Sequence, residues 1–203
     1  MKFTVLCITL SVFFVLSVGA QDASPALAKY SAGETGCVKS FDAGDWKASE
    51  SLCNDALALS IQLPQKFKLE KMNALENYGF TQFRQSKFQL ALSNFTKALN
   101  IGTSFLKGDS TDLAHAYFNV GRANQGMASI TSSYIVPAET NYLQAEKIYR
   151  AAYAAATDAD GKGKIKESIQ RTLGLLKYIA QMRGEDAKVK AIEARMAEFE
   201  TEK

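Results

Sequence analysis

The sequence repeats itself at a spacing of 42 residues. Seven positions match in the first two units: Cys37, Phe41, Trp46, Ser49, Cys53, Ala56 and Leu57 align with Gly79, Phe83, Phe88, Ala91, Phe95, Ala98 and Leu99. The same step from Gly79 leads to Gly121, but Ala138, Tyr142 and Ala145 then arrive five residues late, which indicates an insertion between 126 and 136. Such a period predicts similar units that bury their apolar faces against one another.

Each unit has the pattern of two helices. In the second unit one apolar face holds Leu75, Tyr78, Gly79, Gln82 and Phe83, and another holds Phe88, Ala91, Leu92, Phe95, Ala98 and Leu99, with a polar link at 85–87. This spacing predicts two antiparallel helices. We expect the first unit to begin at a capping box, Ser31 with Glu34, and to turn at Gly44 and Asp45. Later units are expected to begin at Pro64 and at Ser110 or Thr111.

The predicted fold class is therefore all-α, an alpha solenoid of three to four antiparallel helix pairs. The repeats cover 31–61, 64–106, 110–156 and 164–201 within a domain at 31–203, and residues 21–30 form a leader or an extra turn. The fourth pair matches the pattern least, breaks at Gly184, and has a surface rich in Lys and Glu that suits a terminal cap.

Residues 1–20 have the pattern of a signal peptide. Met1 and Lys2 precede an apolar run from Val5 to Val18, and small residues at 18–20 form a cleavage site. The run is shorter than the roughly 20 residues of a membrane span, although an uncleaved anchor is an alternative. We expect an exported protein, periplasmic or secreted, without a span in the mature chain. Loss of Lys2 lowers the net charge from +3 to +2, so nucleic acid is not an expected partner.

The motif Leu75-xx-Tyr78-Gly79, Phe88-xx-Ala91, Phe95-xx-Ala98-Leu99 resembles the tetratricopeptide repeat. The period exceeds the usual length of about 34 residues and is similar to the long-helix repeats of kinesin light chain. The resemblance covers about 31–155, and extends to about 200 with fewer matches. Cys37, Ser49, the insertion and the fourth pair depart from the pattern. The resemblance implies a superhelix whose first helices line a concave, partner-binding face, and it implies no catalysis.

Candidate binding residues lie on the first helices. The resemblance implies that a polar ladder, Thr35, Asn77, Asn119 and Thr172, hydrogen-bonds the backbone of an extended peptide; ordinary hydrogen bonds between helices are the alternative. The same faces carry Phe80, Arg84, His115, Phe118 and Arg122. Aromatic side chains beside arginines suit a peptide with apolar and acidic groups, although Phe80 or Phe118 can instead be packed between repeats.

No constellation of residues predicts an enzyme, a metal site or a cofactor. His115 is the single histidine and lacks the neighbours of a catalytic or metal-binding group. The segment 158–165 resembles half a calcium loop, but Lys162 and Ile169 occupy ligand positions, so we expect a polar loop. The predicted function is a non-catalytic scaffold or adaptor that binds a protein segment or peptide. The alternatives are a self-associating envelope component, and a small-molecule binder with 127–136 as a lid, formed as a loop or as extra helix.

Cys37 and Cys53 are predicted to form a disulfide bond. If two helices flank the turn at Gly44 and Asp45, residues whose numbers sum to about 90 face each other, and 37 plus 53 is 90. These cysteines occupy the small and large positions that Gly79 and Phe95 fill in the next unit. Export would place these two cysteines in an oxidising compartment. Cys7 leaves with the signal peptide, so no third thiol would compete for the bond.

Overall fold

The computed structural model describes residues 23–199, so the predicted signal peptide lies outside the described residues. The helices are α1 (Ala23–Asp42), α2 (Trp46–Gln62), α3 (Lys68–Arg84), α4 (Phe88–Thr103), α5 (Thr111–Ala128), η1 (Ser132–Tyr134), α6 (Ile135–Ala155), α7 (Ala159–Met182) and α8 (Asp186–Ala197). This part of the chain contains no strand. The all-α prediction is confirmed.

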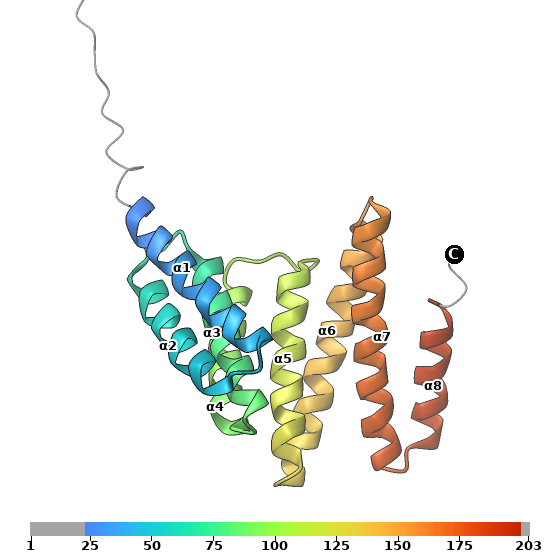
Figure 1. The fold of residues 1–203 in the computed structure, drawn as a ribbon. Coiled ribbons are helices and arrows are strands. Elements are labelled where there is room, and N and C mark those ends of the chain that lie inside the picture. The colour runs from blue at the N-terminus through green and yellow to red at the C-terminus, as the bar shows by residue number, and fades with distance from the viewer. Residues whose placement is uncertain (1–22, 200–203) are drawn as a thin grey trace, which may run out of the picture.

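The helices form four antiparallel pairs that follow one another in chain order (Figure 1). Each second helix also packs on the first helix of the next pair, as α2 does on α3, α4 on α5 and α6 on α7. In addition α1 contacts α3, and α3 contacts α5, whereas in the described chain the even-numbered helices have no comparable contacts with one another, and neither do α5 and α7. This closer packing places α1, α3 and α5 on the inside of the array. We call the surface formed by the odd-numbered helices the inner face.

Three hairpin turns share one backbone conformation. Each has three residues between its helices, and the middle one has a positive φ: Gly44 at 75°, Ser86 at 60° and Gly184 at 68°. Glycine adopts this conformation without steric cost, which explains two of the three. The third turn is longer, since residues 129–134 separate α5 from α6 and include η1. The predicted insertion therefore divides into a short extension of α5 and a 3-10 turn before α6.

The two helices of a pair approach closely where a glycine faces a ring. A Cβ atom on Gly79 would lie 2.7 Å from the ring of Phe95, and one on Gly121 would lie 2.7 Å from that of Tyr142. Both rings are buried. In the first pair a disulfide bond joins Cys37 to Cys53, which confirms that prediction. The aligned glycine of the fourth pair, Gly174, has no such neighbour within 4 Å.

The helix α1 begins at Ala23, so the predicted start at Ser31 was wrong. Ser31 and Glu34 lie inside the helix and form no capping box. The extension is stabilised by Tyr30, which is buried with Leu63 and Ala74. Its hydroxyl hydrogen-bonds the Glu34 carboxylate at 2.8 Å and the Glu70 carbonyl at 2.9 Å.

Two other helix starts also differ from the prediction. The helix α3 begins at Lys68 rather than Pro64, because Pro64 opens a turn in which Phe67 N donates to its carbonyl at 3.0 Å. The segment 158–165 is not a polar loop but the start of α7. Asp158 caps this helix, since its Oδ1 accepts a hydrogen bond from Gly161 N at 2.6 Å.

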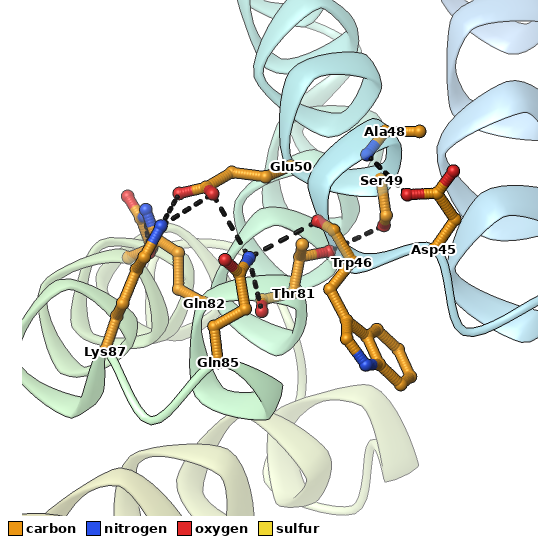
Figure 2. A network of polar contacts seen from close by, with 10 residues as sticks. Asp45, Trp46, Ala48, Ser49, Glu50, Thr81, Gln82, Gln85 and Lys87 are labelled. Carbon is orange, nitrogen blue, oxygen red and sulfur yellow. Dashed lines mark hydrogen bonds and ion pairs between the residues drawn. The ribbon is translucent and has the colours of Figure 1, made fainter.

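A polar network joins the first two pairs at their turns (Figure 2). Glu50 on α2 accepts from Lys87 Nζ at 2.6 and 2.8 Å and from Gln85 Nε2 at 3.1 Å. The hydrogen bond from Lys87 lowers the pKa of Glu50. Deeper in the junction, the hydroxyls of Ser49 and Thr81 lie 2.9 Å apart. The polar link at 85–87 is thus part of an interface between repeats.

Ion pairs connect α8 to α6 across the last repeat. Buried Glu139 accepts from Arg183 at 2.9 Å and also from Lys188, and buried Glu146 accepts from Arg195 at 2.8 Å. Arg150 adds a contact to Glu146 at 2.9 Å. A carboxylate that is shielded from water requires such cations. The charged surface expected of a terminal cap therefore includes interactions that hold the cap in place.

The glycine contacts predict opposite effects of the same substitution at two helical positions. Gly79→Ala forces the Phe95 ring to move and should destabilise the fold by about 1–3 kcal/mol. Gly174→Ala meets open space and should stabilise α7 by about 0.5–1 kcal/mol. Urea unfolding of both variants measures the difference. Equal changes at the two positions would contradict the proposed close approach.

Reduction of the Cys37–Cys53 bond should lower the free energy of unfolding by about 3 kcal/mol, because the bond closes a short loop in the unfolded chain. The measurement is the urea midpoint with and without a reductant. The double variant Cys37→Ala, Cys53→Ala serves as a control whose midpoint should not respond to the reductant. A midpoint of the wild-type protein that is also insensitive would argue against this role.

Candidate binding face

Two asparagines of the predicted ladder link successive helices of the inner face. Asn77 Nδ2 donates to Glu34 Oε1 at 3.2 Å, and Asn119 Nδ2 donates to Glu76 Oε1 at 2.9 Å. Both bonds span 43 residues, so each joins one repeat to the next. Asn119 is buried, while Asn77 is half-buried. These bonds are hydrogen bonds between helices, which is the alternative given above for the ladder. Within the described chain no donor bonds to Oδ1 of Asn77.

The two threonines of the ladder form local bonds instead. The Thr35 hydroxyl donates to the Ser31 carbonyl at 2.8 Å, and the Thr172 hydroxyl donates to the Ser168 carbonyl at 2.7 Å. Thr35 is exposed and Thr172 is buried. The carboxylate–asparagine links are therefore found at the α1–α3 and α3–α5 contacts, and peptide binding by the ladder stays a prediction.

Aromatic rings hold the two arginines that the sequence analysis singled out. The Arg84 guanidinium lies 5.8 Å from the ring centre of Phe41 and 5.6 Å from that of Trp46. The Arg122 guanidinium lies 4.6 Å from the ring centre of Phe83. It lies 5.9 Å from the ring centre of Phe80 and 6.0 Å from that of Phe118. Such stacking orients a guanidinium without neutralising its charge.

The predicted aromatic residues have different degrees of exposure. Phe118 is buried, and its ring centre lies 5.6 Å from that of Tyr142 on the other helix of the same repeat, so this contact is within a repeat rather than between repeats. Phe80 is half-buried and contacts Phe95 edge to face at 5.2 Å. Together with Cys37, Val38, Phe41 and Asn77, Phe80 lines a pocket of about 80 Å³ between α1 and α3.

Three arginines gather on this face without an anionic partner. Within residues 23–199, no carboxylate forms an ion pair with Arg84, Arg122 or Arg171. Burial lowers the pKa of Arg122, and the charges of Arg84 and Arg171 lower it further. Sequence reasoning missed Arg171, although its position directly before Thr172 is a signal that could have found it.

An acidic group lies beside this cluster. Burial raises the pKa of Glu76 to about 7, Asp112 contributes to the rise, and the hydrogen bond from Asn119 opposes it. His115 is exposed and contacts the Tyr149 ring edge to face at 5.5 Å. The protein atoms around this imidazole still remove part of its water, which lowers the pKa of His115; Asp112 raises that pKa and Arg171 lowers it. The face can therefore change its charge near neutral pH.

The described chain holds no group of three or more His, Cys, Asp and Glu side chains that could bind a metal ion. No helix between residues 23 and 199 is long and apolar enough to span a membrane. In the described part of the chain, the inner face presents cationic groups, aromatic surface and the amide oxygen of Asn77.

Comparison with known proteins gives one kind of match. No protein-family model matches the sequence, and no curated protein matches it. Among solved structures, the chain is similar to the crystal structure of BtubC (BKLC) from P. vanneervenii. The match covers 88% of this chain and 82% of the BtubC chain, with a TM-score of 0.51 and 15% sequence identity. At this identity the likeness concerns the fold alone, and it supports a tetratricopeptide-like helical repeat.

The raised pKa of Glu76 predicts a pH effect with a definite sign. The fold favours the protonated carboxyl, so this contribution to stability is present below about pH 4.5 and is lost as the pH rises through about 7. Glu76→Gln removes the titration and keeps an acceptor for Asn119. The free energy of unfolding, measured in urea at pH 5 and pH 8, should therefore fall more with pH in the wild type than in Glu76→Gln.

Glu167→Gln, an equal charge change at an exposed position of α7, provides the control and should retain the pH response of the wild type. If Glu76→Gln behaves like this control, the pKa of Glu76 does not govern the response.

Proposed function

We propose that this protein is an exported, non-catalytic scaffold that binds an extended protein segment along its inner face. The observation that carries the proposal is the group formed by Arg84, Arg122 and Arg171, which have no carboxylate partner in the described chain. Arg84 and Arg171 are exposed, whereas Arg122 is half-buried and loses part of its water on folding. A charged group in that position without a counter-charge gains more from an anionic ligand than a solvated one does.

The chemistry of the face favours a segment that combines acidic and apolar side chains. Two arginines present guanidinium groups that can hold carboxylates in bidentate fashion, and both lie near aromatic rings. The pocket beside Val38 and Phe80 gives an apolar side chain a place to bury. The free Oδ1 of Asn77, oriented by the bond of its amide to Glu34, can accept a backbone N–H from the segment.

Export and a protein partner fit these features. The disulfide bond is of the kind that persists in oxidising compartments, so the periplasm or the extracellular space is the proposed location. Helical repeats of this architecture commonly present an extended inner surface to other proteins.

A selection from a display library of random 12-residue peptides tests the proposal. Peptides enriched on the wild-type protein should contain Asp or Glu next to apolar residues. Their affinity, measured by fluorescence anisotropy, should fall about tenfold or more in the double variant Arg84→Gln, Arg122→Gln, because two charge-assisted contacts are lost. The affinity should also fall with added salt.

The matched control is the double variant Lys97→Gln, Lys147→Gln, which removes the same charge from exposed positions on α4 and α6. It should bind the peptides as the wild type does. The proposal fails if no peptide is enriched, or if the enriched peptides bind both double variants equally well.

A further inference from the structure

The ends of the first two hairpins are filled by pairs of aromatic rings. Phe41 contacts Trp46 with ring centres 5.2 Å apart, and Phe83 contacts Phe88 at 5.3 Å, both edge to face. Each pair joins the last turn of a first helix to the first residue of the second helix. The repeat spacing, with the insertion included, places Gln125 and Ile135 at these positions in the third hairpin. Neither residue has a ring.

A pocket lies where the ring pair would be. Its volume is about 160 Å³, and it lies between the end of α5, the beginning of α6 and the end of α7, the lower ends of these helices in Figure 1. Most of its lining is apolar: Ala128, Ile135, Ala138, Ile179 and Met182. An engineered apolar cavity of about 150 Å³ binds benzene, so this volume is sufficient for one ring.

Two polar side chains line this pocket besides Tyr178. The Ser129 hydroxyl already donates to the Gly126 carbonyl at 2.6 Å. The Oε1 atom of Gln125 accepts a hydrogen bond from the Tyr142 hydroxyl at 2.6 Å. This bond fixes the orientation of the amide. The Nε2 atom donates to no acceptor within residues 23–199, so it is free to donate to a ligand. Pockets for small molecules typically combine an apolar lining with a few such groups.

Large apolar side chains are exposed in the lining of the pocket and directly beside it. Met182 is 61% exposed, Tyr178 is 50% exposed, and Val136, directly after Ile135, is 58% exposed. A ligand with a ring would bury part of this surface, which is a favourable change.

We propose that the pocket between α5, α6 and α7 binds a small molecule with one aromatic ring and a hydrogen-bond acceptor. The ring takes the place of the ring pair found in the first two hairpins, and the acceptor receives the N–H of Gln125. This site is separate from the inner-face arginines, so it goes beyond the proposed binding of a protein segment and stands or falls independently of it.

Two probes of the same shape test the proposal on the mature chain. Acetophenone has a ring and a carbonyl acceptor, whereas ethylbenzene has the ring without the acceptor. Both should shift the methyl NMR signals of Ile135, Ile179 and Met182 in a saturable manner. Acetophenone should bind roughly two- to tenfold more tightly, the effect of one hydrogen bond, and Gln125→Leu should remove this preference.

Ile135→Phe restores one ring and should abolish binding of both probes without lowering the melting temperature. If this variant does not fold, Ala128→Leu narrows the same pocket from α5. Leu90→Phe, which adds the same ring at an exposed position on α4, should bind both probes as the wild type does.

The proposal is overturned if neither probe shifts the three methyl signals of the wild type, or if the shifts persist in a folded variant with the filled pocket. It is also overturned if these signals move with protein concentration in the absence of a probe, since a second copy of the chain would then cover the pocket.

Discussion

The close approach of the two helices in the second and third pairs determines much of the rest of the structure. At Gly79 and Gly121 the absence of a Cβ lets a ring from the second helix lie directly against the backbone of the first. Because Asn77 and Asn119 precede these glycines by two residues, the contact also fixes the direction in which each asparagine points. The hydrogen bonds to Glu34 and Glu76 then join neighbouring first helices. One packing rule thus sets both the spacing within a pair and the alignment between pairs.

The same arrangement explains why the inner face is cationic although acidic residues lie on it. The carboxylates of Glu34 and Glu76 accept from asparagines of the next repeat, and burial keeps Glu76 partly protonated near neutral pH. The guanidinium groups of Arg84 and Arg122 lie near the rings of Trp46 and Phe83 instead of beside these carboxylates. The side-chain amides of Asn77 and Asn119, and not the arginines, are thus the partners of these carboxylates. The positive charge of the arginines stays available to a ligand.

The sequence predicted those features that depend on contacts within one repeat. The 42-residue period located the helix pairs, and the pairing across the first turn identified Cys37 and Cys53 correctly. Features that depend on a neighbouring repeat were missed. The start of α1 depends on Tyr30 and its contacts with Leu63 and Ala74, and the bonds of Glu139 and Glu146 to α8 join residues 49 apart. A periodic pattern describes what repeats have in common, whereas these interactions occur once.

The departures from the period are where the repeats acquire separate roles. In the first pair the glycine position holds Cys37, and the disulfide bond replaces the ring contact. In the fourth pair Gly174 faces open space, and ion pairs from α6 hold α8 instead. The third pair keeps its glycine contact at Tyr142 but loses the ring pair at its turn, and none of the described side chains fills the space. Two departures are compensated by bonds within the chain, whereas the third leaves an apolar pocket, which is what binding of a ligand from outside the chain requires.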